Sequence, residues 1–100
     1  MFGTIGHFHP KPGSESKFKS LMDEWDRTMR PQIPGKVLQL SGRPKDRPGE
    51  VVFIALFQDE ATYRDLANKP EQNTWYERMM EMVDGEITWE DVEFDDFRES

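Results

Sequence analysis

The sequence predicts an α+β fold: a four-stranded antiparallel sheet with helices packed on one of its faces. Segments with strand and helix patterns alternate along the 100 residues in the order β-α-β-β-α-β. That order is the split-βαβ, ferredoxin-like arrangement. The segment 51–57 is apolar at every position, as expected for a strand buried on both faces. We expect one domain that spans residues 1–100.

The first two elements are a short strand over 4–9 and a helix that runs from Ser14 to about Arg30. The strand is rich in β-branched and aromatic residues, and prolines follow it. Ser14 is a candidate N-cap, and Pro31 ends the helix. Apolar residues recur between them at three- and four-residue steps, which predicts one buried helix face. These residues are Phe18, Leu21, Met22, Trp25 and Met29.

The next two strands are predicted over 36–41 and 50–57, with a loop rich in proline and glycine between them. Alternation places Phe53, Ala55 and Phe57 on one face of the second strand and Val52, Ile54 and Leu56 on the other. Helices on one side of the sheet leave the other apolar face uncovered. We therefore expect a homodimer that packs sheet to sheet.

The remaining elements are two helical segments and a last strand. Asp59 is a candidate N-cap for a short helix, and Pro70 suits the first position of the next helical segment. Asp84-Gly85 is expected to close that segment, and 86–94 is expected to form the last strand. The second segment has an apolar stripe made of Trp75, Tyr76, Met79, Met80 and Val83.

The net charge of −7 belongs to one end of the chain. Residues 1–83 hold equal numbers of acidic and basic side chains, whereas 84–100 hold eight acids and one base. This distribution argues against nucleic-acid binding and against docking on an anionic membrane. It indicates a solvated strand and tail more than a patch for a cation or a basic partner. The chain has no cysteine and no apolar run of membrane-spanning length, so a cytoplasmic location is expected.

Candidate functional residues fall into two groups. His7 and His9 lie two apart on a strand and so share a face, where they could carry protons. No third ligand accompanies them, so no metal site is predicted. Met22, Trp25, Phe57, Trp75 and Met79 either line a space between helices and sheet or pack as plain core. In such a space tyrosine hydroxyls and indole N–H groups would anchor a flat, partly polar molecule.

Three stretches carry a resemblance to a known family. They are 9–13 (HPKPG) before the first helix, the strand 51–57 continued by 58–63 (QDEATY), and the Trp75-Tyr76 helix. With these the chain resembles the dimeric α+β barrel proteins like antibiotic biosynthesis monooxygenases. The resemblance implies a homodimer. It also implies a cofactor-independent monooxygenase that acts on a small aromatic or polyketide-like molecule.

Under that resemblance Trp25, Tyr63, Trp75 and Tyr76 would position the substrate, and His7 or His9 would carry protons. The alternative is a non-catalytic dimer, ligand-binding or stress-related, since the superfamily hosts many roles. Haem breakdown is disfavoured. Haem-degrading relatives look as if they need Asn, Trp and His at three positions, where this chain has Gly6, Leu66 and Tyr76.

Overall fold

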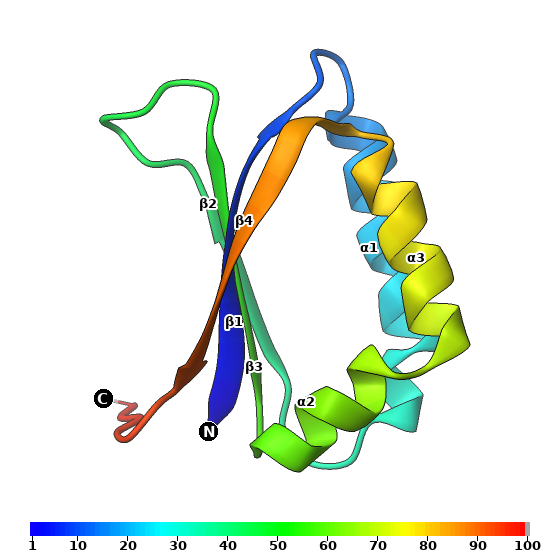
Figure 1. Ribbon diagram of the computed structural model, residues 1–100, viewed down its shortest axis with the longest axis vertical. Helices are drawn as coiled ribbons and strands as arrows, with labels where there is room; N and C mark the ends of the chain where they lie inside the picture. Colours follow the sequence, from blue (N-terminus) through cyan, green and yellow to red (C-terminus); the bar gives the residue numbers. More distant parts are fainter. Residues whose placement is uncertain (100) are drawn as a thin grey trace.

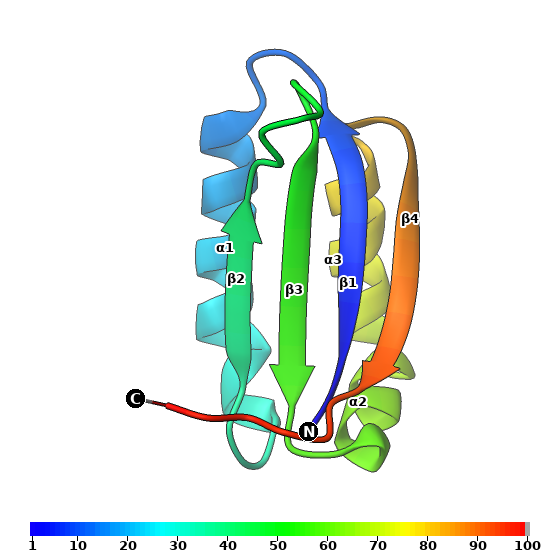
Figure 2. The same cartoon turned by 90° about the vertical axis from the view of Figure 1, so that its left-hand side faces the viewer.

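The computed structural model of the protein describes residues 1–99 and contains one antiparallel sheet with strand order β2-β3-β1-β4. All three α-helices lie on one face of this sheet, and no helix covers the other face (Figures 1 and 2). The α+β, ferredoxin-like class predicted from the sequence is confirmed. No helix within residues 1–99 is long and apolar enough to cross a membrane. The elements are β1 (Phe2–Pro10), α1 (Glu15–Thr28), η1 (Arg30–Gln32), β2 (Leu38–Gly42), β3 (Val51–Phe57), α2 (Glu60–Ala67), α3 (Pro70–Met80) and β4 (Val83–Glu93).

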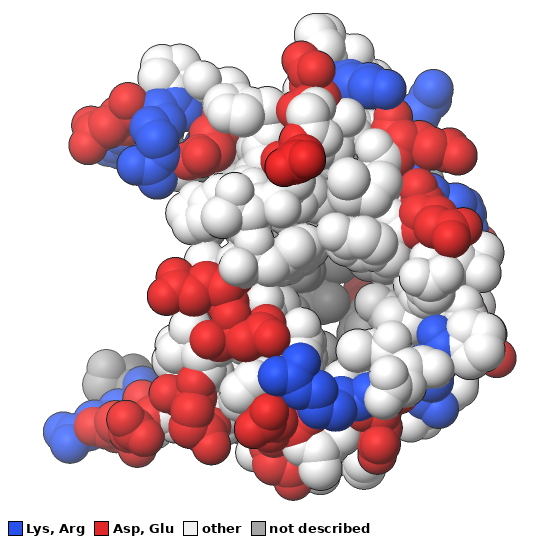
Figure 3. Space-filling view, in the orientation of Figure 1, with Lys and Arg blue, Asp and Glu red and all other residues white. Residues whose placement is uncertain are grey.

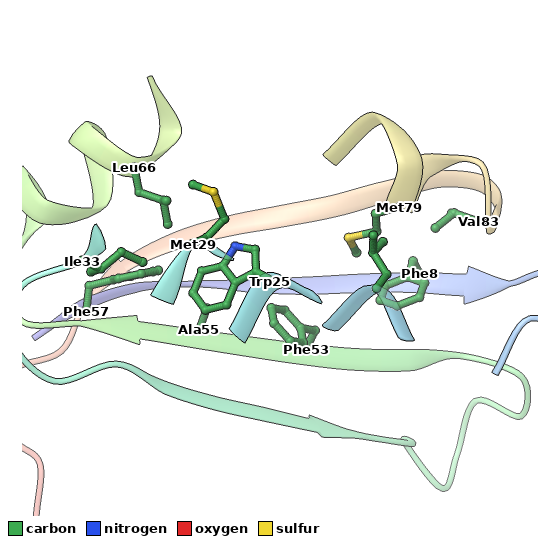
Figure 4. Close-up of a cluster of buried hydrophobic side chains, with 11 residues drawn as sticks. Phe8, Trp25, Met29, Ile33, Phe53, Ala55, Phe57, Leu66, Met79 and Val83 are labelled. Atoms are coloured by element: carbon green, nitrogen blue, oxygen red, sulfur yellow. The ribbon is translucent and has the colours of Figure 1, made fainter. Parts of the chain in front are cut away.

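The core lies between the sheet and the helices. On β3, Phe53, Ala55 and Phe57 are buried and face the helices, as their alternation predicted. From α1, Trp25 reaches down to the sheet over Ala55, while Met79 of α3 packs at the other end of the cluster (Figure 4). The helices are therefore held by large side chains that converge on the centre of β3.

Local capping explains where the helices begin. Asp59 caps α2 as predicted, because its carboxylate accepts hydrogen bonds from the Thr62 backbone N–H at 2.8 Å and from the Thr62 hydroxyl at 2.7 Å. These bonds hold the pKa of Asp59 below its ordinary value. Ser14 does occupy the position before α1, but its hydroxyl donates to the Lys11 carbonyl oxygen at 2.7 Å and makes no cap bond.

The predicted boundary between α3 and the last strand is wrong. Asp84-Gly85 does not close the helix, which ends at Met80, and β4 already begins at Val83. Val83 is buried and pairs with Pro10 of β1. The pairing then shifts between His7 and His9, and Gly85 takes a positive φ of 85° in this irregular stretch. The glycine thus permits a bulge inside the strand rather than a helix end.

The uncovered face of the sheet carries an apolar patch. Leu40, Ile54 and Ile5 are neighbours across β2, β3 and β1, and Leu40 is 63% exposed. The flanking row brings Leu38, Leu56 and Val92 to the same face. We call this surface the open face. Its patch consists of Ile5, Leu38, Leu40, Val52, Ile54, Leu56 and Val92.

Gly6 of β1 is required by close packing. A Cβ at this position would lie 2.6 Å from the Trp89 ring of the neighbouring strand. We expect Gly6→Ala to destabilise the fold by about 1–3 kcal/mol in urea unfolding, since the indole has to move. The matched control is Gly42→Ala, whose Cβ would meet its nearest neighbour, Val52, at 3.9 Å. Equal unfolding midpoints for the two variants would contradict this account.

Candidate functional site

A cavity of about 380 Å³ lies between the sheet and the helices. The space-filling view shows a hollow there, bordered mainly by uncharged side chains (Figure 3). Every strand and every α-helix contributes to its wall. Its size falls within the range of small-molecule sites, and its combination of aromatic walls with a few polar groups is typical of them. The apolar part of the wall consists of Trp25, Phe53, Ala55, Phe57, Leu66, Ala67, Trp75, Met79 and Trp89.

The aromatic walls are locked by their own hydrogen bonds. Trp25 donates from Nε1 to Oε1 of Gln72 at 2.8 Å, and Trp75 donates from Nε1 to the Leu21 carbonyl oxygen at 3.0 Å. The two indoles are tilted against each other with centroids 6.5 Å apart. Since both N–H groups already have acceptors, these indoles offer a ligand their faces only. This differs from the sequence-based expectation that they would anchor a ligand through N–H.

A second aromatic pair, Tyr76 and Trp89, joins α3 to β4. Trp89 donates from Nε1 to the Tyr76 hydroxyl oxygen at 2.9 Å, and the ring centroids are 6.2 Å apart. Trp89 also lies over Gly6, so it fills the space that the missing side chain leaves. Within residues 1–99 the Tyr76 hydroxyl has no acceptor for its own proton, which leaves it as a donor at the cavity wall.

Polar groups from α2 and β4 meet at the cavity wall. The Tyr63 hydroxyl donates to Oδ1 of Asp91 at 3.2 Å, and Arg64 donates to Oδ2 of Asp91 at 3.4 Å. Burial, together with the charge of Asp91, raises the pKa of Tyr63. The Tyr63 phenol is therefore a neutral hydrogen-bond donor around pH 7, and Asp91 is the acceptor.

The cavity is a better candidate than a second hollow on the outer side of the helices. That hollow is larger, about 520 Å³, but it is open and lined mostly by polar and charged side chains of α1 and α3. Two of these, Arg78 and Glu24, form an ion pair with each other. Within residues 1–99, no group of three or more His, Cys, Asp or Glu side chains is arranged to hold a metal ion.

Comparison with solved structures identifies proteins that share this fold. No family model matches the sequence, and no curated protein is similar to it. SnoaB, a cofactor-independent oxygenase from Streptomyces nogalater, matches in structure with a TM-score of 0.76 and 16% identity over 96% of this chain and 94% of its own. The fold is that of the antibiotic biosynthesis monooxygenase-like proteins.

Two further structures of similar fold cover equally much of the chain. One is an antibiotic biosynthesis monooxygenase, with a TM-score of 0.70 and 18% identity over 94% of this chain and 98% of its own. The other is a protein from Mycobacterium tuberculosis, with a TM-score of 0.74 and 16% identity over 98% of both chains. The resemblance noted in the sequence is thus confirmed for the monooxygenase-like fold. The chemistry has to be argued from the site itself.

Most of the predicted substrate-binding residues lie together in this cavity. Trp25, Phe57, Tyr63, Trp75, Tyr76 and Met79 all line it. Met22 is half-buried against the core and does not line the cavity.

The histidines lie elsewhere. Phe8 on β1 faces the core, so His7 and His9 point to the open face, across the sheet from the cavity. His7 Nδ1 lies 3.7 Å from Glu50, whose pKa is held below its ordinary value mainly by a hydrogen bond from Arg47.

Sequence reasoning missed several cavity residues, and three of them, Gln72, Trp89 and Asp91, matter most for the polar contacts of the wall. Trp89 and Asp91 fall in the acid-rich end of the chain, which composition indicated as a solvated edge. Their spacing could have indicated this: Ile87, Trp89 and Asp91 lie two apart on a strand and so share a face, which is the face towards the helices. No sequence signal identifies Gln72, whose role depends on contact with Trp25, 47 residues away in the chain.

The raised pKa of Tyr63 predicts a difference in alkaline stability. The folded state holds the phenolic proton more tightly than the unfolded state, whose ordinary value is 10.0. The unfolded chain therefore loses this proton first, and the free energy of unfolding falls as pH rises above about 10. We expect Tyr63→Phe to lose stability less steeply than the unmodified protein between pH 9 and 11 in urea titrations. Parallel curves for the two proteins would show that this phenol is not perturbed.

Proposed function

We propose that the protein is a cofactor-independent monooxygenase-like enzyme that acts on a small aromatic molecule in the cavity between sheet and helices. The observation that carries the proposal is the cavity itself, which has flat aromatic walls and a hydroxyl donor, Tyr76, at its side. The fold shared with a cofactor-independent oxygenase supports it. Apolar walls exclude water and hold a planar ring by contact with its faces.

The reaction class is oxygen insertion with the substrate as reductant. The O–O bond of O2 breaks, one oxygen atom is inserted into a ring C–H bond to give C–OH, and the other leaves as water with two protons and two electrons from the hydroxyl groups of the substrate, which becomes a quinone. We assign the Tyr76 hydroxyl to hydrogen bonding with the oxygen atom that leaves, because its proton is free. Trp25 and Trp75, which pack against each other, would orient the ring by contact with the faces they present to the cavity.

This proposal leaves the two histidines out of the chemistry. His7 and His9 lie on the open face, and the sheet separates them from the cavity. Haem breakdown is not proposed either. Leu66 is only 4% exposed and belongs to the apolar core, while the Tyr76 oxygen is already bonded to Trp89. The cavity wall thus supports an aromatic ligand rather than an iron ligand set.

Oxygen consumption with a panel of dihydroxynaphthalenes tests the proposal. We expect oxygen uptake to match, one to one, the formation of a quinone that carries one added oxygen atom, without release of hydrogen peroxide. We expect Tyr76→Phe to lower kcat on the order of 100-fold, since a positioned proton donor contributes at least that much. His9→Gln, a change to an exposed side chain on the opposite face, should leave the rate unchanged.

Two outcomes would count against this assignment. Equal rates for Tyr76→Phe and the unmodified protein would remove the role of Tyr76. Binding of the naphthalenes without any oxygen uptake would favour the second candidate, a non-catalytic protein that binds a small ligand. One observation favours that candidate: the three indole N–H groups of the wall are all used within the fold, so few groups remain for chemistry.

We further propose that a second copy of the chain covers the open face. The patch runs across all four strands of the sheet; no helix of residues 1–99 covers it, and the C-terminal segment after β4 crosses only one end of it (Figure 2), where Leu56 is buried. An apolar surface of this extent is typical of an interaction site. The fold family supports a copy of the same chain as the occupant, because both partners then present the same apolar patch. The cytoplasmic location expected from the sequence stays a prediction.

Leu40→Glu tests the dimer with little risk to the folded monomer, because Leu40 is already 63% exposed. A carboxylate buried in an apolar interface lacks a partner, so we expect the dimer to weaken on the order of 100-fold or more. Sedimentation equilibrium measures this shift towards the monomer. The control is Ser41→Glu, because Ser41 is exposed on the same strand but pairs with the core-facing Phe53. A monomeric unmodified protein at micromolar concentration would refute the proposal.

A further inference from the structure

We propose that Asp91 recognises the hydroxyl group of the ligand and makes the cavity select neutral, hydroxyl-bearing aromatics over aromatic carboxylates. The inference rests on the proposed use of the cavity as a ligand site, but not on oxygen chemistry. Among the cavity-lining residues of 1–99, Asp91 is the single acidic side chain, and no basic side chain lines the wall. A ligand in the cavity therefore meets one negative charge and no positive one.

The Asp91 carboxylate is held in place with acceptor capacity to spare. Tyr63 bonds one of its oxygens and Arg64 the other. A carboxylate has about four acceptor positions, so two remain for a ligand. Arg64 is itself fixed by Glu60 of the same helix turn and lies 5.3 Å over the Tyr63 ring. The neighbours thus orient the carboxylate without saturating it.

Within residues 1–99, Asp91 is the only charged acceptor of the wall, because the other side-chain carbonyl acceptors, Gln39, Gln72 and Asn73, carry neutral amides. The Trp89 indole N–H is bonded to Tyr76, and the Thr4 hydroxyl donates to the Glu90 carbonyl oxygen at 3.3 Å. The Tyr63 hydroxyl, kept neutral by its raised pKa, already donates its hydrogen bond to Asp91. A phenolic hydroxyl is a strong donor, and its hydrogen bond to an ionised acceptor is stronger than one to a neutral acceptor.

The same charge excludes anionic ligands. An aromatic carboxylate that reached this end of the cavity would face Asp91 and lose its own water shell. Arg64 does not reverse this effect, because the two negative charges of Glu60 and Asp91 outweigh its single positive charge. Asp91 is 36% exposed in its side chain and its ion pair with Arg64 is open to solvent, so replacing it should cost the fold little.

The test uses three probes of one shape: 1-naphthol, 1-methoxynaphthalene and 1-naphthoate. Binding is followed by calorimetry and by tryptophan fluorescence, without oxygen turnover. The unmodified protein should bind 1-naphthol about tenfold or more tightly than the methyl ether, as expected for a hydrogen bond to an ionised acceptor. Asp91→Ala should abolish that preference, and Asp91→Asn should raise the affinity for 1-naphthoate. Glu86→Gln, an exposed change on the same strand away from the cavity, should leave all three affinities unchanged.

The outcomes separate this inference from the proposed function. A naphthol preference that survives Asp91→Ala would overturn the role of Asp91 while the cavity remains a ligand site. Binding of none of the probes would overturn the cavity as an aromatic site, and this inference with it. A preference that depends on Asp91, found in a protein that consumes no oxygen, would support this inference and refute only the monooxygenase proposal.

Discussion

The double-sided apolar character of β3 is the constraint on which the rest of the structure depends. Two crossover connections link parallel strands of the sheet, one through α1 and one through α2 and α3. Because such crossovers share one handedness, both place their helices on the same side of the sheet. The helices thus bury one face of β3 and leave the other bare (Figure 1). The covered face holds the cavity, and the other face is the surface on which we propose that a second copy packs.

Helices with a regular apolar stripe or a local cap were predictable from the sequence. Boundaries that depend on hydrogen bonding between distant strands were not. The stripe that contains Leu21 and Trp25 predicted α1, and both residues are buried. Asp59 predicted the start of α2, because capping is a local interaction. The start of β4 was mispredicted, because Asp84-Gly85 is an ordinary helix stop in sequence and becomes a strand bulge only through its pairing with β1.

The same distinction applies to the site. Trp25, Trp75 and Tyr76 were predictable, since each belongs to an apolar helix stripe that has to face the sheet. Their hydrogen bonds were not predictable, because Trp25 bonds to Gln72 and Trp75 to Leu21 across long sequence separations. Those bonds decide what the cavity offers a ligand. By occupying the indole N–H groups, they fix the ring orientations in advance and leave recognition to ring faces and to a few oxygen atoms.

The acidic end of the chain has two roles: most of its carboxylates hydrate the surface, and Asp91 lines the cavity. The count of eight acids in 84–100 indicates a solvated tail, and all eight are exposed, Asp91 among them. Strand alternation nevertheless turns Asp91 towards the cavity, where Tyr63 and Arg64 hold it. A charge beside low-dielectric aromatic walls acts more strongly on a ligand than the same charge in water. The neighbouring acids of β4 add potential of the same sign, so a strand that keeps the surface hydrated also disfavours anionic ligands in the adjacent cavity.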